Sequence, residues 1–412
     1  MKQRITLLTF FLSASFSFSQ TNPVISSWIQ NTSATGYAGI LTNVQVVQYN
    51  TTNCFVSCTC IPGYDIGPWA GNPNTPSNQN FVFKFPLAPV QNTGTLTVVG
   101  LGHIGTWVNG VSIYNAKDAN SYNSQGIWHQ TALFFEGASF DSCLGHPAPN
   151  GEYHHHVSPR CLYDPLDSTH HSPIIGFAYD GFPVYGAYAY QNTNGTGPIV
   201  RMRSSYQPRL WMTQRDSLPD GTALTAGQYG PAVSGTYPVG AYCEDYKFVS
   251  TYGDLDVHNG RFCITPEYPG GTYCYFVTLG SDLSPVYPYT IGDTYYGILA
   301  TGNTGPGSGH NTIPGGTTVY TPTGISETDK SIQFEFYPNP VTDVAQLFFE
   351  GSSANNLTAE IFSTDGKKMA QLSDLHPGIG YELNLKILPT GNYFIHIQSE
   401  TSSAVQQFLK VE

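Results

Sequence analysis

Histidines are concentrated in one part of this sequence: six of the twelve lie between residues 146 and 171. If residues 152–157 form a strand, side chains alternate between its faces, so His154 and His156 project from the same face. His146, on the loop just upstream, can add a third imidazole. Three nitrogen ligands with one open position are typical of a catalytic divalent transition metal. The spacing therefore predicts a zinc or copper site at these three histidines.

Two carboxylates are candidates to assist such a metal. Asp141 and Asp180 flank the histidine segment, and either can act as a general base or orient a ligand imidazole. Asp180 is followed by Gly181 between two apolar runs, which is also the signal of a hairpin turn. The alternative for the histidines themselves is a structural or surface cluster without an evolved metal site.

The histidine segment has a second copy further along the chain. The stretch from Asp141 to Val157 matches residues 256–277, with five additional residues between its two parts. The aspartate, both glycines, the proline, the first tyrosine and the valine are kept. The candidate ligands are replaced: His146 by Arg261, His154 by Cys274 and His156 by Phe276. We therefore expect two similar strand-and-loop units, of which only the first keeps the ligands.

Eight cysteines, an even number, predict disulfides if the chain enters an oxidising compartment. Cys143 and Cys161 bracket the histidine cluster, and Cys263 and Cys274 bracket part of the second copy. We expect these two local pairs to be bonded. The partners of the other cysteines stay open.

Residues 1–19 have the pattern of a secretory signal peptide. Lys2 and Arg4 precede an apolar run at 5–12, and small residues follow at Ser17 and Ser19. No later stretch approaches the ~20 apolar residues of a transmembrane helix. We therefore expect export across the inner membrane and no transmembrane segment.

The composition limits the class of protein. With 16 Lys+Arg against 28 Asp+Glu, the formal charge is −12, which excludes a protein that binds nucleic acid or anionic membranes through a basic surface. The 43 glycines, 29 prolines and 14% aromatic residues favour strands and ordered loops. The expected fold class is mostly β.

The composition changes near residue 303. Residues 303–329 are rich in Gly, Pro and Thr and predict a linker between a β-rich domain at 20–302 and a domain at 330–412. The last segment has no cysteine, and its short runs of alternating apolar residues predict a small Ig-like β-sandwich.

The last domain carries several landmarks of one family. They are Phe336-Tyr-Pro-Asn-Pro-Val341, Asp365-Gly366, Leu388-Pro-Thr-Gly-Asn-Tyr393 and Phe408-Leu-Lys-Val-Glu412. Over about 80 residues this segment resembles the C-terminal sorting domain of the type IX secretion system of Bacteroidota. The resemblance implies recognition by that secretion machinery, removal of the domain, and release from the cell or attachment to its outer surface.

Several motifs follow one another between residues 90 and 300. They are Cys143-Leu-Gly-His146, Gly151-Glu-Tyr-His-His-His156, the stretches 171–186 and 201–206, and Asp256 to Tyr273. Over this region the chain resembles the YHYH domain family. The family name describes a sequence pattern and implies no established reaction. This chain departs from the pattern at His155, where the family has Tyr. In the strand interpretation that side chain faces away from the proposed ligands.

Two functions remain open. The first is an extracellular metal-dependent hydrolase or oxidase, with zinc favouring hydrolysis and copper favouring oxidation. The second is a non-catalytic binding or adhesion protein. Its histidines would be structural, and its 25 tyrosines outside the last domain would form a contact surface for a glycan or another extracellular ligand.

Overall fold

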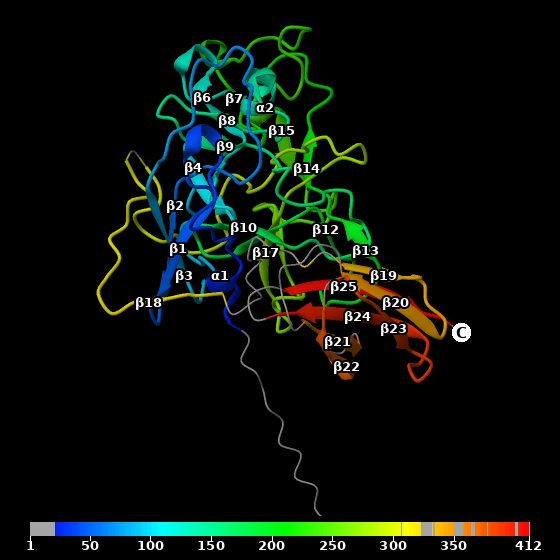
Figure 1. The fold of residues 1–412 in the computed structure, drawn as a ribbon. Coiled ribbons are helices and arrows are strands. Elements are labelled where there is room, and N and C mark those ends of the chain that lie inside the picture. The colour runs from blue at the N-terminus through cyan, green and yellow to red at the C-terminus, as the bar shows by residue number, and fades with distance from the viewer. Residues whose placement is uncertain are drawn as a thin grey trace, which may run out of the picture. The chain divides into compact units, whose positions relative to one another are not determined.

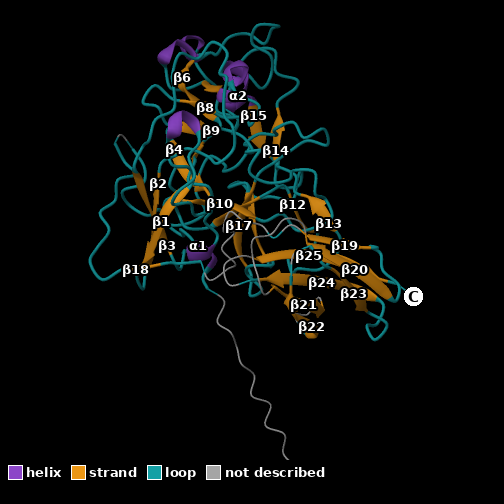
Figure 2. Cartoon of the chain, in the orientation of Figure 1, coloured by secondary structure: helices purple, strands orange, loops and turns teal. Residues whose placement is uncertain are grey.

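The computed structural model describes residues 21–305, 307–322, 332, 334–349, 357–363, 367–376, 378–399 and 403–411 (Figure 1). The chain forms two compact units that divide between Tyr320 and Thr321. Strands make up most of the regular structure, and the helices are short (Figure 2). The mostly β fold is thereby confirmed. The predicted signal peptide, residues 1–19, lies outside the described residues.

The largest sheet of the first unit has eight strands. They are β4 (His103–Trp107), β5 (Ser112–Tyr114), β8 (His146–Pro147), β9 (Tyr153–His155), β10 (Ile174–Ala178), β11 (Pro183–Tyr185), β16 (Gly260–Cys263) and β17 (Thr272–Phe276). Their order across the sheet is β16-β17-β11-β10-β4-β5-β9-β8. The two central strands, β4 and β10, are buried at every residue, as expected for strands covered on both faces.

This sheet consists of two halves that meet at the antiparallel pair β4–β10. In each half an antiparallel hairpin is followed by a parallel strand and then by an antiparallel edge strand. Even the irregularities agree, because the register shifts between His103 and Gly105 and again between Ile174 and Gly176. The sequence of parallel and antiparallel pairings is therefore the same when it is followed from either edge to the centre. The two similar strand-and-loop units are confirmed.

An aspartate closes the loop that leads into each edge strand. Asp141 accepts hydrogen bonds from the Tyr153 hydroxyl, at 2.9 Å, and from the backbone N–H of Gly145, at 3.1 Å. A Cβ atom at Gly145 would overlap the Tyr153 hydroxyl, so this position requires glycine. The second half has the same arrangement, built from Asp256, Tyr273 and Gly260.

A four-stranded sheet packs against the large one. Its strands are β1 (Val44–Tyr49), β2 (Asn53–Cys58), β3 (Phe81–Pro86) and β18 (Thr318–Val319), in the order β18-β1-β2-β3. Alternate residues of β3 are buried, and the Phe83 ring lies 5.3 Å from that of Tyr179. One hydrophobic core therefore joins the two sheets.

Short elements surround the large sheet. They are α1 (Pro23–Ser26), α2 (Ala132–Phe135) and the strand pairs β6 (Lys117–Ser121) with β7 (His129–Thr131), β12 (Tyr188–Tyr190) with β13 (Ile199–Arg201), and β14 (Tyr206–Pro208) with β15 (Tyr246–Phe248). Among the described residues, no helix has the length and apolar character needed to cross a bilayer.

The first part of the predicted linker is packed onto the first unit. Asn303 is fully buried and exchanges hydrogen bonds with the backbone of Lys84. His310 bridges to Val82, and β18 pairs with β1. The division between the units therefore falls at 320/321, later than the composition change at 303. Hydrogen bonds of polar side chains and backbone pairing hold this segment in place. Its low content of apolar residues gave no indication of this packing.

One of the two predicted cysteine pairs is a disulfide in the structure, and the other is a pair of thiols. Cys143 and Cys161 form a disulfide that closes a loop around the histidine segment. Cys263 and Cys274 lie on the paired strands β16 and β17 as thiols, with their Sγ atoms 3.9 Å apart. The other cysteines, Cys54, Cys58, Cys60 and Cys243, are buried thiols.

The second unit contains two sheets. Its strands are β19 (Phe334–Tyr337), β20 (Val344–Phe349), β21 (Leu357–Ser363), β22 (Lys368–Leu375), β23 (Gly380–Asn384), β24 (Gly391–Gln398) and β25 (Ser403–Lys410). The sheet orders are β19-β20-β23 and β22-β21-β24-β25. Leu347 from the first sheet and Ile361 and Ile395 from the second belong to one buried core, which is the arrangement of a small β-sandwich.

A buried ion pair yields a stability prediction. The Arg215 guanidinium and the Asp245 carboxylate lie 2.7 Å apart, and both side chains are fully buried. Both residues belong to the segment that connects β14 to β15 along the chain. Replacing Arg215 by Met leaves the Asp245 charge buried without its partner, so we expect a loss of roughly 3–5 kcal/mol in the free energy of unfolding. Urea unfolding of the purified protein measures this loss.

The exposed pair of Arg203 and Asp254 provides the matched control. Its N–O distance is 2.9 Å, but the Arg203 side chain is 62% exposed. Solvent weakens such a pair, so Arg203→Met should cost less than about 1 kcal/mol. Equal losses in the two variants would contradict the role assigned to burial.

The second predicted disulfide can be tested directly. Because the Cys263 and Cys274 Sγ atoms lie 3.9 Å apart, we expect them to be bonded in protein recovered from an oxidising compartment. Mass spectrometry of unreduced peptides detects the link. In Cys263→Ser, Cys274 loses its partner, so its thiol should react with a thiol reagent once the protein is unfolded. Recovery of both residues as thiols from the oxidised wild type would refute this expectation.

Candidate metal centre

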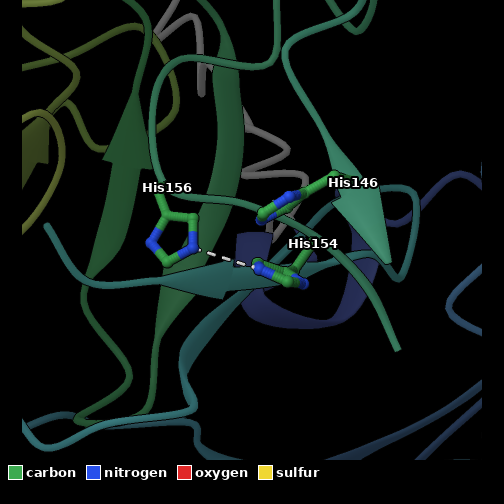
Figure 3. Close-up of side chains that lie close together, drawn as sticks. All are labelled: His146, His154 and His156. Atoms are coloured by element: carbon green, nitrogen blue, oxygen red, sulfur yellow. Dashed lines mark hydrogen bonds between the residues drawn. The ribbon is translucent and has the colours of Figure 1, made fainter. Parts of the chain in front are cut away.

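Three histidines converge at one edge of the large sheet. His146 lies on β8, His154 lies on β9 and His156 follows β9, and their rings point toward one another (Figure 3). One nitrogen of each ring lies within 4.8 Å of the other two. Within the described part of the chain, this is the only group of three or more His, Cys, Asp or Glu side chains with metal-ligand spacing.

The local fold explains this convergence. His146 and His154 are direct partners in the antiparallel pair β8–β9, so their side chains leave the same face. Strand alternation brings His156 to that face as well. His155 points the other way, where its Nε2 atom lies 3.4 Å from the Tyr64 hydroxyl. The sequence-based arrangement of the three rings thus matches the geometry.

The outer nitrogen of each ring is already engaged. Nδ1 of His154 lies 3.0 Å from the backbone carbonyl of Glu152, and Nδ1 of His156 lies 2.6 Å from that of Asn115. A carbonyl oxygen only accepts, so both Nδ1 atoms carry hydrogen, and the neutral rings have a lone pair on Nε2. Nδ1 of His146 contacts the Ser139 hydroxyl at 2.7 Å. Such outer contacts orient metal-binding histidines.

The inner nitrogens have no suitable partner among themselves. The Nε2 atoms of His154 and His156 lie 3.1 Å apart. With both rings neutral, two lone pairs would face each other, a contact that is unfavourable unless a cation or proton binds there. The buried Nε2 atom of His146 has no hydrogen-bond partner. Two nitrogens about 2.05 Å from a tetrahedral zinc ion are about 3.3 Å apart, close to the observed spacing.

Two of the three imidazoles are held in the neutral form. Burial, followed by the charge of His156, lowers the pKa of His146 to about 4. The same causes, with His146 adding to them, hold the pKa of His154 well below its ordinary value. Both imidazoles are therefore neutral in neutral solution, the form that binds a metal ion.

The three rings line a cavity of about 480 Å³. Glu136, the residue after α2, lines the same cavity, and its Oε2 atom lies 3.3 Å from Nε2 of His156 and 3.8 Å from Nε2 of His146. Burial raises the pKa of Glu136, but the hydrogen bond and positive charge from His156 outweigh it, so the net shift is downward. The site therefore combines three imidazoles, of which His146 and His154 are held neutral, with one ionised carboxylate beside open space.

Aromatic rings hold the imidazoles in place. The Tyr114 ring stacks on His154 with centroids 3.8 Å apart. Phe140 lies parallel to His156 at 6.1 Å and edge-on to His146 at 4.8 Å. Together with the bonded Nδ1 atoms, these contacts fix the ring directions before any ligand binds.

The two carboxylates proposed from the sequence lie elsewhere and do not line this cavity. Asp141 is used by the Tyr153 hydroxyl and by backbone N–H groups of its own loop. Asp180 occupies a hairpin turn, where it accepts hydrogen bonds from Phe182 and Gly297 N–H groups, and burial raises its pKa to about 6. The structural interpretation of Asp180 as a turn residue fits these contacts.

Sequence reasoning missed Glu136 and Tyr114. A signal for Glu136 was available, because it is the only acidic residue between Asp118 and Asp141 and lies ten positions before His146. No comparable signal exists for Tyr114. It reaches His154 through the parallel pairing of β5 with β9, which local sequence patterns do not reveal.

Comparison with known proteins agrees with the two-part organisation. A family model for the secretion system C-terminal sorting domain matches residues 335–411. This tail is typical of the type IX system of Bacteroidota, so it indicates interaction with that machinery and an extracellular or cell-surface location. No curated protein matches the chain. A second family model, described as YHYH protein, matches residues 82–287, which is half of the chain, and the protein therefore belongs to the YHYH family.

Proposed function

We propose that this secreted protein binds one divalent transition metal through His146, His154 and His156 and uses it in hydrolysis. The observation that carries this proposal is the contact between the Nε2 atoms of His154 and His156, 3.1 Å apart, beside the unpartnered Nε2 of His146. Three imidazoles leave a position open toward the cavity, as in catalytic sites. Zinc fits this ligand set best, and copper is the alternative ion.

The Glu136 carboxylate is the reason that we favour hydrolysis over oxidation. A bound ion of this kind supplies Lewis-acid polarisation of water or of a substrate oxygen. The Glu136 carboxylate, 3.3 Å from His156 Nε2 and partly exposed to the cavity, is placed to accept a proton from water there. We therefore assign the role of base to Glu136, in place of Asp141 or Asp180.

The export route forms part of the proposal. We infer that residues 1–19 act as the signal peptide and that the domain at 330–412 is removed when the chain is released or attached outside the cell. We keep the YHYH-type domain at 20–302 and the linker at 303–329 as proposals. Residues 303–320 of that linker pack with the first unit.

A purely adhesive role has less support from the side chains. Ten of the tyrosines available for a contact surface are at most 5% exposed: Tyr153, Tyr179, Tyr185, Tyr206, Tyr242, Tyr273, Tyr275, Tyr287, Tyr289 and Tyr295. They fill the core and satisfy buried carboxylates. The abundance of tyrosine therefore serves the fold, and the histidine site is the better candidate for function.

Metal content tests the first part of the proposal. Protein loaded with zinc and passed through gel filtration should keep about one equivalent per chain. His146→Ala and His154→Ala each remove a nitrogen ligand and should lower the affinity more than ~100-fold, measured by competition with a chromophoric chelator.

His155→Tyr is the matched control for these variants. It changes a neighbouring ring that faces away from the site, and it introduces the residue of the family pattern. It should bind zinc as the wild type does and keep its melting temperature within a few degrees. A wild type that retains no metal after loading, or alanine variants that bind as well as wild type, would overturn the proposal.

Cobalt spectra test the open position and the role of Glu136. In the cobalt(II)-loaded protein, added azide should change the visible spectrum, because a three-histidine site leaves room for another ligand. Glu136→Gln should keep the cobalt content and the azide response if the carboxylate is a base. A Glu136→Gln spectrum that already differs before azide is added would show that Glu136 is a ligand instead.

A further inference from the structure

A second cavity adjoins the metal centre. It has a volume of about 690 Å³ and shares Leu101, Gly102 and Tyr114 with the first. Its wall is partly apolar, through Phe81 and Leu299 among others. The histidines of the metal site do not line it, so whatever binds here meets a different set of polar groups.

Three of those groups form a chain of hydrogen bonds. The Glu152 carboxylate lies 2.9 Å from Nδ1 of His103, and Nε2 of the same ring lies 2.9 Å from the Ser308 hydroxyl. An ionised carboxylate only accepts, so Nδ1 carries the hydrogen and Nε2 has the lone pair. Nε2 is then the acceptor for the Ser308 proton. The Ser308 Oγ atom also lies 2.7 Å from the Gly305 carbonyl, which competes for the same hydrogen.

Burial makes this chain rigid at one end and open at the other. Glu152 is 3% exposed and His103 is 8% exposed, whereas Ser308 is partly exposed on the cavity wall. The rings of Phe81 and Phe83 each stand edge-on to the His103 ring at 5.3 Å. The imidazole therefore has one orientation, with its free nitrogen directed at the hydroxyl.

The two halves of the sheet differ at this place too. His103 is paired with Tyr114, and the corresponding pair in the second half is Ile174 with Tyr185. The shared scaffold thus needs no histidine at this position. An imidazole joined to a buried carboxylate is not required by the fold, which favours a chemical role.

We propose that Ser308, His103 and Glu152 form a second catalytic site, in which Ser308 is the nucleophile toward carboxylic esters with an apolar acyl group. This inference is independent of the metal site. A carboxylate, an imidazole and a hydroxyl linked through the two ring nitrogens in this order activate a serine for acyl transfer. The apolar wall of the cavity provides space for the acyl chain.

The reaction proceeds in two balanced steps. Ser308 Oγ attacks the ester carbonyl carbon while its proton passes to His103 Nε2. The bond to the leaving oxygen then breaks, and that oxygen takes the proton as an alcohol. Water next attacks the acyl-serine, again giving its proton to His103, and the carboxylic acid leaves as Ser308 regains its hydrogen. Glu152 keeps the ring in the required tautomer and is a positioning residue.

A tagged alkyl fluorophosphonate tests the nucleophile without knowledge of the ester. Its phosphorus should be attacked by Ser308 in the full mature chain, with loss of fluoride and a mass increase on the peptide that contains residue 308. Ser308→Ala should show no label there, and His103→Gln should label at least ~100-fold more slowly because the base is lost. Labelling is measured with a chelator present and repeated in His154→Ala, so that failure of the metal proposal does not affect the result.

The protein contains its own control. Asp167 and Thr169 both contact Nδ1 of the exposed His170 at 2.9 Å, so the same residue types are present without a path through the ring. Thr169 should stay unlabelled. Absence of label on Ser308 in folded wild type, or equal labelling in His103→Gln, would overturn the proposal.

A gain-of-thiol variant covers the case in which His103→Gln does not fold. In Ser308→Cys, the adjacent imidazole should speed alkylation by iodoacetamide at least ~10-fold over Ser284→Cys. The Ser284 hydroxyl is exposed and donates to the Asp282 carboxylate, so a thiol placed there has only a weakly basic carboxylate beside it and no imidazole. Equal rates for the two thiols would likewise refute the proposal.

Discussion

The hydrogen bond from the Tyr153 hydroxyl to the buried Asp141 carboxylate determines where the first histidine lies. Asp141 also holds the N–H of Gly145, so one side chain joins the loop before β8 to the strand β9. This join places His146 opposite His154. The close approach leaves no room for a Cβ atom at Gly145, which makes the loop conformation dependent on glycine. His154 and His156 are aligned by strand alternation alone, whereas the position of His146 also depends on this loop.

The same contact in the second half shows that the backbone arrangement does not depend on the metal-binding side chains. Asp256 and Tyr273 reproduce the hydrogen bond, although the residues that follow cannot bind a metal in the same way. Arg261 donates to backbone carbonyls there, and Cys274 faces Cys263. One backbone arrangement therefore carries imidazoles in one half and a guanidinium with thiols in the other. The differences between the halves mark where chemistry was placed on a common frame.

Local patterns in the sequence predicted those parts of the site that depend on neighbours along the chain. Alternation in β9 correctly separated His154 and His156 from His155, and the internal match located the second unit. The carboxylate was not predictable in the same way, since Glu136 reaches the rings through the turn after α2. Asp180 lies away from the histidine cavity, in a hairpin turn, and it accepts hydrogen bonds from the backbone N–H groups of Phe182 and Gly297. The linker segment after 303 lacks apolar residues, yet side-chain amides such as that of Asn303 and strand pairing hold it in place.

Tyr114 connects the two cavities physically. Its ring stacks on His154, and Tyr114 also lines the second cavity beside Glu152, which in turn holds His103. The backbone carbonyl of Glu152 also fixes Nδ1 of His154. A displacement of Glu152 would therefore disturb an imidazole in each cavity at once. Two sites that share a wall need not act on the same substrate, although the backbone of Glu152 contacts one site and its carboxylate contacts the other. Every residue from Glu152 to His156 is buried, so packing holds the side chains of this segment in fixed positions for both sites.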